Sequence, residues 1–237
     1  MPNPYFKFKQ FTIHQDRCAM KVSTDAVVLG AIANQENPKY ILDIGAGTGV
    51  IALMMAQRFS NAHIKAVETD EPAYHQALEN ITDSPWKNSI QLDHKPFQEF
   101  LGQSQGQFDL IVSNPPYFPN HNKSTNAQRN LALHNDGLPF GDLIKGVNKL
   151  LAKEGQFWVI LPPQQMKELE KIAKFFQLSP SHSIALKDRP DTKTLRLIQS
   201  FSYQNYPSKT ETLCIKNEDF SYSEPYSNLL KDFLLIF

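Results

Sequence analysis

Short apolar runs alternate with amphipathic segments along most of this chain. Runs of consecutive or nearly consecutive apolar side chains predict strands near residues 40–44, 63–67, 89–93, 108–112 and 155–161. The segments between and after them predict helices near 49–59, 71–82, 140–151 and 163–176. Because strands and helices alternate, the pattern indicates an α/β fold built on a parallel sheet.

The two ends of the chain carry further predicted elements. A helix is expected from Ser23 or Thr24, either of which can cap it, to about Asn34. Strands near 182–187 and 195–203 are expected to close the sheet as an antiparallel pair, and a short strand near 212–215 and a helix near 226–235 follow. We therefore expect one domain over 1–237, made of an N-terminal arm and helix (1–39), a core (40–203) and a C-terminal extension (204–237).

Composition narrows the class of protein. With 237 residues the chain can bury one large core. No apolar run reaches the ~20 residues that span a bilayer, and the first residues lack the charged-then-apolar pattern of a secretion signal. Cys18 and Cys214 are isolated, and the histidines show no ligand spacing, so we expect a cytoplasmic protein without a disulfide framework or a metal.

Charge is balanced, with 24 basic and 24 acidic side chains. A net charge of zero disfavours an extended nucleic-acid surface, which is usually basic. Local phosphate contacts remain open, because they depend on where individual lysines and arginines lie. Two segments are candidates for such contacts, and the alternative for both is an ordinary solvated loop. They are the arm with Lys7, Lys9, Arg17 and Lys21, and the segment 187–196.

A glycine-rich turn follows the first predicted core strand. Asp43-Ile44-Gly45-Ala46-Gly47-Thr48-Gly49 leads from that strand directly into a helix, the order that opens nucleotide-binding α/β units. Glycines allow a tight turn and a close approach of the backbone to a ligand. Glu68 ends the next strand, 25 residues after Asp43, where an acid can accept hydrogen bonds from two ribose hydroxyls. The spacing excludes a P-loop, and the alternative for the glycines alone is a plain turn.

The most informative feature is Asn114-Pro115-Pro116-Tyr117, which follows the apolar run 108–113. The Asn114 side-chain oxygen and the Pro115 carbonyl can accept hydrogen bonds from a planar amine, which favours a pyramidal nitrogen with a free lone pair. Pro116 restricts the backbone, and Tyr117 offers a ring on which a base can stack. Acceleration would come from positioning and desolvation rather than from a strong base. Alone, the motif could be a rigid turn; its place downstream of the glycines and the acid favours catalysis.

In these motifs the chain resembles the class I S-adenosylmethionine-dependent methyltransferases. The glycine turn is similar to their first motif, Glu68 to their second and Asn114 to Tyr117 to their amino-methylating fourth, over roughly residues 40–201. The resemblance implies a Rossmann-like, doubly wound, seven-stranded sheet that is mostly parallel with an antiparallel final strand. It also implies S-adenosylmethionine across the carboxyl ends of the strands, with cofactor contacts from Asp43, Gly45, Gly47, Glu68 and Asn114.

Methyltransferases that act on different acceptor nitrogens share this four-residue motif. Glutamine methyltransferases of release factors share it but carry a helical N-terminal domain, whereas only 39 residues precede the first core strand here. DNA adenine methyltransferases usually add a large recognition domain, and ribosomal-RNA guanine methyltransferases more often have Phe in place of Tyr117. The glutamine reaction stays an alternative. So does a non-catalytic S-adenosylmethionine- or RNA-binding module, against which the intact motif argues.

The first residues resemble a narrower family. Residues 6–25 are similar to the opening of the bacterial tRNA adenine-N6 methyltransferases, which modify adenosine 37 beside the anticodon of a valine tRNA. The resemblance implies that Lys21 and Thr24 lie near the methionine end of the cofactor; the alternative is that Thr24 only caps its helix. We expect a monomer whose partner is a tRNA anticodon stem-loop, with bases that stack on aromatic rings. The implied substrate contacts are Tyr117, Phe118, Lys123 and Arg129.

Two positions depart from the pattern of these relatives. Leu133 stands where the family tends to have arginine, so one RNA or loop contact that the resemblance implies is in doubt. Pro96 stands where many relatives have an acid that bonds the adenine of the cofactor, and proline has no side-chain donor or acceptor. Adenine recognition is then expected from Phe97, through its backbone and ring, or from Asp93.

Overall fold

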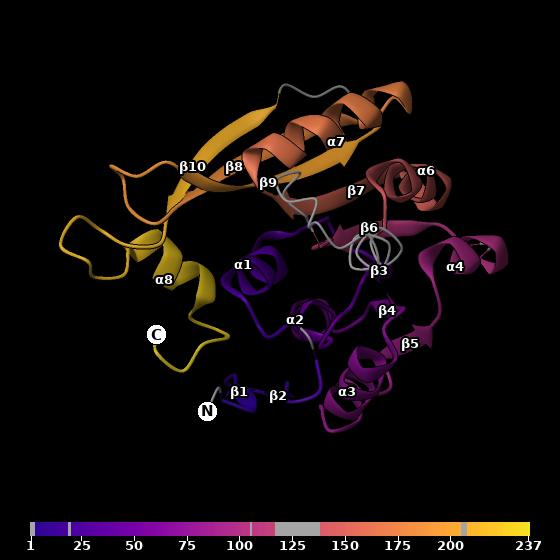
Figure 1. Cartoon of the computed structure of the whole chain (residues 1–237), viewed down its shortest axis with the longest axis horizontal. Helices are drawn as coiled ribbons and strands as arrows, with labels where there is room; N and C mark the ends of the chain where they lie inside the picture. The colour runs from indigo at the N-terminus through magenta and orange to yellow at the C-terminus, as the bar shows by residue number, and fades with distance from the viewer. Residues whose placement is uncertain (1–2, 19, 105, 117–137, 205–207) are drawn as a thin grey trace, which may run out of the picture.

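The computed structural model describes residues 3–18, 20–104, 106–116, 138–204 and 208–237 (Figure 1). Within these ranges an eight-stranded sheet runs in the order β10-β8-β9-β7-β6-β3-β4-β5. Its strands are β3 (Tyr40–Ile44), β4 (His63–Glu68), β5 (Ile90–His94), β6 (Phe108–Ser113), β7 (Leu151–Leu161), β8 (Ser179–Lys187), β9 (Thr194–Ser202) and β10 (Lys209–Cys214). A separate antiparallel hairpin, which the sequence did not predict, joins β1 (Tyr5–Lys7) to β2 (Thr12–His14).

Helices cover both faces of the sheet (Figure 1). One layer contains α1 (Thr24–Ile32), α2 (Val50–Arg58), α3 (Glu71–Thr82) and α8 (Glu224–Leu230), and the other contains α4 (Phe97–Gln103), α6 (Phe140–Leu150) and α7 (Pro163–Phe175). Successive strand residues contribute to opposite layers: Leu110 packs in the first and Ile111 in the second. Since both faces are covered, the central strands are mostly apolar, which explains why the sequence shows them as nearly continuous apolar runs.

The predicted fold class is confirmed, and the strand count is corrected. β9 runs antiparallel to both β7 and β8, while the other described pairings of the large sheet are parallel. The described sheet has eight strands rather than seven because β10 pairs in parallel with β8 from Lys209 to Cys214. Only a short strand near 212–215 was expected there. β10 is an edge strand with mostly polar residues, and such strands give a weak apolar signal.

Helix α1 begins one residue after its cap. The Ser23 hydroxyl accepts the N–H of Ala26 at 3.2 Å, so Ser23 is the N-cap and Thr24 is the first helical residue. The alternative interpretation of Thr24 as the cap is therefore wrong. The helix ends at Ile32, with Ala33 as its C-cap, slightly before the expected end near Asn34.

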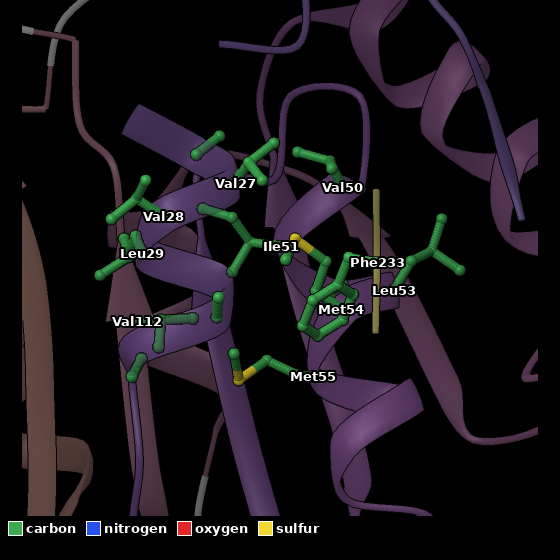
Figure 2. Packing of buried hydrophobic residues seen from close by; sticks show 14 of the residues in the cluster. Val27, Val28, Leu29, Val50, Ile51, Leu53, Met54, Met55, Val112 and Phe233 are labelled. Carbon is green, nitrogen blue, oxygen red and sulfur yellow. The ribbon is translucent and has the colours of Figure 1, made fainter. Parts of the chain in front are cut away.

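Helix α2 is enclosed on all sides, and it anchors the glycine turn that precedes it. Every residue from Val50 to Ala56 is buried. Figure 2 shows Val27, Ile51 and Met54 in the space between α1 and α2. The two helices approach closely at Gly30, where a Cβ atom would lie 2.7 Å from the Met54 sulfur. Because α2 is so firmly packed, the end of the glycine turn that leads into it has little freedom to move.

The N-terminal hairpin and the C-terminal segment pack against each other. Phe8 forms an antiparallel bridge with Leu234, and the Lys9 N–H donates to the Phe233 carbonyl at 2.8 Å. The Lys9 ammonium also donates to the carbonyl oxygen of Phe237 at 2.8 Å. Phe8 and Phe233 are buried in the same cluster as helices α1 and α2. The arm is thus held against the layer that carries the glycine turn.

Substitution Gly146→Ala is expected to destabilise the protein, although alanine usually stabilises a helix relative to glycine. Gly146 is buried on α6, and a Cβ atom there would lie 2.3 Å from Cε1 of the Phe97 ring. Overpacking of this kind costs about 1–3 kcal/mol, so the Tm in thermal unfolding should fall. Gly141→Ala is the matched control on the same helix, since a Cβ atom there meets nothing within 4 Å. Equal Tm values for the two variants would contradict the prediction.

Candidate functional site

The carboxyl ends of three neighbouring strands bring the predicted site residues together. Ile44 at the end of β3 is opposite Val67 of β4 and Ser113 of β6. The glycine turn, Glu68 and Asn114 therefore leave the sheet at one edge, where open α/β sheets bind ligands. The Ser113 hydroxyl donates to the Ile44 carbonyl at 2.9 Å, which ties the residue before Asn114 to the strand before the glycine turn.

The glycine turn has the backbone that its sequence predicted. Gly45, Gly47 and Gly49 have φ angles of 78°, 56° and 81°, in the left-handed region that side chains disfavour. The N–H groups of Gly45 and Ala46 donate to the Val67 carbonyl at 2.9 and 3.1 Å. Glycine is thus required by the backbone conformation, and the turn is fastened to β4 on one side and to α2 on the other.

Glu68 is buried at the end of β4 and already accepts three backbone hydrogen bonds. One carboxylate oxygen accepts the N–H groups of Thr69 and Asp70, both at 2.8 Å. The other accepts the N–H of Gly47 at 2.7 Å. A carboxylate offers roughly four lone-pair sites. Glu68 as described therefore has room for about one further donor, and a ligand with two hydroxyls would have to replace the Gly47 N–H at the second site.

Asp43 is a fully buried carboxylate with one oxygen satisfied. Its Oδ2 accepts the N–H of Ala52 at 3.1 Å, while Oδ1 has no hydrogen-bond partner among the described residues. Burial raises the pKa of Asp43 to about 7, the Ala52 N–H opposes that rise, and the charge of Glu68 adds to it. An unpaired buried acceptor beside a glycine turn is suited to a cationic ligand group, which would favour the charged form of Asp43.

Asn114 directly follows the end of β6. Asn114 is half-buried, Pro115 is buried and Pro116 is exposed. A residue before proline is restricted to extended backbone, so the direction of the Asn114 side chain is constrained. The predicted substrate contacts lie outside the described residues: Tyr117, Phe118, Lys123 and Arg129. So does Leu133, the position of the missing arginine.

The predicted cofactor contacts of the arm lie on its exposed side. Lys21 is exposed, and its ammonium lies 3.4 Å from the Asn3 carbonyl oxygen, to which it donates. Thr24 is exposed at the first position of α1. Next to it, the Asp25 carboxylate pairs with the Arg196 guanidinium of β9 at 2.6 Å. The start of α1 is therefore joined to the antiparallel strand, and the described contacts do not join Lys21 or Thr24 to the glycine turn.

Phe97 and Asp93 differ in what they offer to an adenine. The Phe97 side chain is 5% exposed and packs in the cluster under α4 and α6. A ring so enclosed offers little surface, and the Phe97 N–H in the first turn of α4 is the better candidate contact. Asp93 is partly exposed on β5 and lies opposite Val67. Pro96 is the N-cap of α4, and its carbonyl accepts the N–H groups of Glu99 and Phe100.

Sequence reasoning missed two buried polar residues on α3. Gln76 and Asn80 are 0% and 1% exposed and lie one helical turn apart on the face that packs inward. Gln76 accepts the N–H of Arg17, and Asn80 bonds both the arm and the glycine turn. A polar side chain on the apolar face of a predicted helix was the available signal, because such groups need buried partners.

No group of three or more His, Cys, Asp or Glu side chains in the described ranges could hold a metal ion. No helix there is long and apolar enough to cross a membrane.

Comparisons with known proteins match the motifs to named relatives. Residues 21–181 match the family model described as "Methyltransferase small domain". A "tRNA1(Val) (adenine(37)-N6)-methyltransferase" of Parabacteroides distasonis is 44% identical over 236 residues, covering 99% of both chains. A protein of the same name from Pseudoalteromonas translucida is 42% identical over 230 residues, covering 97% of this chain and 98% of its own.

Solved structures share the fold at low sequence identity. The crystal structure of a "predicted O-methyltransferase" from Agrobacterium tumefaciens aligns with a TM-score of 0.68, at 17% identity, over 88% of this chain and 96% of its own. At that identity the likeness shows the architecture alone. The sheet order and the flanking helices described above are therefore those of a Rossmann-like α/β fold.

Proposed function

This chain belongs to the family of tRNA1(Val) (adenine(37)-N6)-methyltransferases, and from that premise we propose that it methylates the N6 amine of adenosine 37 in the anticodon loop of a valine tRNA, with S-adenosylmethionine as donor. One structural observation carries the proposal: Asn114 leaves the sheet at the same edge as the glycine turn and Glu68. An amine held at Asn114 and a donor held across the glycine turn would lie side by side.

The residues at this edge fit the proposed cofactor. The remaining acceptor site of Glu68 suits a ribose hydroxyl, and the unpaired Asp43 oxygen suits the amino group of the methionine end. When bound, S-adenosylmethionine supplies a methyl group on a positively charged sulfur. The remaining proposed cofactor contacts are Lys21, Thr24, Gly45, Gly47, Phe97 and Asn114.

Asn114 and Pro115 would orient the acceptor nitrogen. The exocyclic amine of adenine is a poor nucleophile, because its lone pair is delocalised into the ring. The Asn114 Oδ1 and the Pro115 carbonyl accept hydrogen bonds from the two amine hydrogens and favour a pyramidal nitrogen whose lone pair points at the methyl carbon. The nitrogen becomes positively charged as the new bond forms, so a proton can then pass to solvent without a strong base. Positioning is the main contribution of these residues.

The anticodon loop is a suitable substrate for such a site. A target base must leave its stack to enter a pocket at the sheet edge, and this costs least in a single-stranded loop. We propose that Tyr117 and Phe118 stack on loop bases and that Lys123 and Arg129 contact phosphates. We propose that the protein acts on tRNA in the cytoplasm. We treat residues 1–237 as one methyltransferase domain, since the arm and the C-terminal segment share a buried cluster with the core.

The proposal is tested by methyl transfer to RNA. Purified protein and labelled S-adenosylmethionine are incubated with total tRNA from a bacterial strain that lacks the corresponding enzyme. Nucleoside mass spectrometry should show N6-methyladenosine, and fragment mapping should place it at position 37 of a valine tRNA. Methylation of a release-factor peptide instead of RNA would favour the glutamine reaction. Cofactor and tRNA binding without transfer would favour a non-catalytic module.

Cofactor binding near pH 7 is expected to release a fraction of one proton. Burial raises the pKa of Asp43 to about 7, so the carboxyl group is partly protonated in the ligand-free protein at that pH. A cationic amino group placed beside it favours the charged form and lowers the pKa. Isothermal titration with S-adenosylhomocysteine at pH 7, in buffers of different ionisation enthalpy, measures the proton released.

The Asp43→Asn variant serves as the control for this proton release. It keeps an acceptor for the Ala52 N–H but cannot ionise. The raised pKa of Asp43 also makes the stability of the fold depend on pH. A carboxyl group with a raised pKa stabilises the fold at low pH, and that contribution is lost as pH rises towards 7. The ligand-free parent should thus lose more stability than Asp43→Asn between pH 5 and about 8. A binding heat independent of buffer would contradict the prediction.

A further inference from the structure

Asn80 of α3 is a buried side chain that bonds two segments far apart in the sequence. Its Nδ2 donates to the Thr48 carbonyl of the glycine turn at 2.9 Å. The same nitrogen donates to the His14 carbonyl of the arm at 3.0 Å, and Oδ1 accepts the His14 N–H at 2.8 Å. With 1% of its surface exposed, Asn80 has both ends of its amide satisfied. A fully bonded buried amide is costly to disturb and specifies one arrangement of its partners.

The bond to Thr48 reaches the centre of the glycine turn. Thr48 lies between Gly47 and Gly49, which both have left-handed backbone and little intrinsic preference for one conformation. The described backbone bonds of the turn run to Val67 of β4, to Leu53 of α2, whose N–H donates to the Gly49 carbonyl at 3.0 Å, or stay within the turn, as in Gly49 N–H to Ala46 at 2.8 Å. Asn80 adds a fixed donor on the α3 side. It thereby sets the plane of the Thr48 peptide between two flexible residues.

The bonds to His14 fix the start of the arm segment that passes the same site. Beyond His14, the Arg17 N–H donates to Gln76 Oε1 at 3.1 Å. Cys18 follows, and it lies close enough to Glu68 for that charge to act on it. Burial and then the charges of Glu68 and Asp70 raise the pKa of the Cys18 thiol to about 11. The arm is therefore held against α3 at two points, at His14 by Asn80 and at Arg17 by Gln76.

We propose that Asn80 is a positioning residue that couples the N-terminal arm to the glycine turn, so that the cofactor site is formed before the ligand arrives. The proposal rests on the function above, in which this site binds S-adenosylmethionine. Removing the Asn80 amide frees the Thr48 peptide and the arm together. The protein must then order both on binding, which weakens affinity without changing the groups that act on the acceptor amine.

Three variants separate this role from simple packing. Asn80→Ala removes all three bonds, and Asn80→Asp keeps the acceptor for the His14 N–H but loses both donations. Gln76→Ala is the matched control, because Gln76 is equally buried on the same helix and bonds the arm at Arg17 but not the turn. We expect both Asn80 variants to bind S-adenosylhomocysteine about 10- to 100-fold more weakly in calorimetry. Gln76→Ala should stay within about threefold of the parent.

Hydrogen exchange of the ligand-free proteins supplies a readout that does not depend on activity. Both Asn80 variants should show faster exchange over residues 45–49, and Gln76→Ala should show it only over residues 14–18. In tRNA methylation the KM for S-adenosylmethionine should rise in the Asn80 variants, while kcat at saturation stays within about threefold. Asn80→Asp should retain part of the arm protection that Asn80→Ala loses.

Other outcomes overturn the proposal. If a folded Asn80→Ala variant binds S-adenosylhomocysteine as tightly as the parent, Asn80 does not couple the arm to the glycine turn. If Gln76→Ala loses as much affinity as Asn80→Ala, the effect comes from docking of the arm alone. If the Asn80 variants do not fold, exchange of the parent in low denaturant decides: coupling requires residues 14–18 and 45–49 to open together. If the parent protein binds S-adenosylhomocysteine but does not methylate tRNA, the proposed function is contradicted. The affinity and exchange measurements on the Asn80 variants still test the coupling in that case.

Discussion

Asn114→Ala is expected to lower kcat for tRNA methylation by about 10²- to 10³-fold. The substitution removes one of the two acceptors proposed to hold the amine hydrogens, and loss of a single preorganised hydrogen-bonding group at a reacting centre has effects of this size. The backbone should be little changed, because the Ser113 hydroxyl bond to Ile44 and the two following prolines remain. Single-turnover methyl transfer to tRNA measures the loss of rate.

Two companion variants make the Asn114 result specific. Asn114→Asp keeps one acceptor oxygen in the same place and should retain more activity than alanine. Asn217→Ala removes an asparagine from an exposed loop, where its amide bonds Ser221, and should leave kcat unchanged. Methylation by Asn114→Ala at the parental rate would contradict the catalytic role. A parallel binding measurement with S-adenosylhomocysteine shows how far Asn114 also contributes to cofactor affinity.

Glu68→Ala is expected to weaken S-adenosylmethionine binding by about 10- to 100-fold, which is the size of effect for hydrogen bonds to a charged acceptor. The carboxylate holds the N–H groups of Gly47, Thr69 and Asp70, and in the proposed site it would also accept a hydrogen bond from the ribose. Glu68→Gln should be nearly as damaging. Whichever way its amide is turned, the NH₂ group faces at least one backbone N–H donor. Calorimetry with S-adenosylhomocysteine measures both losses of affinity.

The neighbouring Asp70 provides the control for charge alone. Its carboxylate caps α3 by accepting the Ala73 N–H at 3.0 Å, and asparagine caps helices about as well as aspartate. Asp70→Asn therefore removes one negative charge near the site while keeping the local fold. It should bind the ligand within about threefold of the parent. If Asp70→Asn and Glu68→Gln lose affinity equally, the effect of Glu68 comes from net charge and not from its hydrogen bonds.

Some of the site was predictable because its residues have strong local signatures. Gly45 and Gly47 occupy positions where only glycine turns easily, and they turn as expected. Asn114 precedes two prolines, which biases its backbone to extended geometry and makes this segment recognisable from the sequence. Glu68 was placed by its distance from Asp43 and by the strand before it, and the register of β3 with β4 brings it to the turn. That this acid already holds the Gly47 N–H could not be predicted, since it depends on exact side-chain geometry.

Other features were missed because their signals are weak or non-local. β10 is a polar edge strand, so its apolar pattern was too short to give its full length. The β1–β2 hairpin has three residues in each strand, and it is held by Phe233 and Leu234 from the opposite end of the chain. The Phe97 ring was expected to pack on a ligand, yet it lies in the core against Gly146. None of these contacts can be predicted from residues that are neighbours in the sequence.

The sequence by itself determined most of the core strands and helices, the glycine turn, the diproline segment and the reaction type that they indicate, but not β1, β2 or α4. These depend on backbone preferences and on apolar periods that act over a few residues. Only the tertiary structure decided which distant groups meet. Asn80 bonds His14 from 66 residues away and Thr48 from 32 residues away, and Ser113 bonds Ile44 across 69 residues. Such contacts depend on the order and register of strands and on the packing of helices over them, which no local pattern specifies.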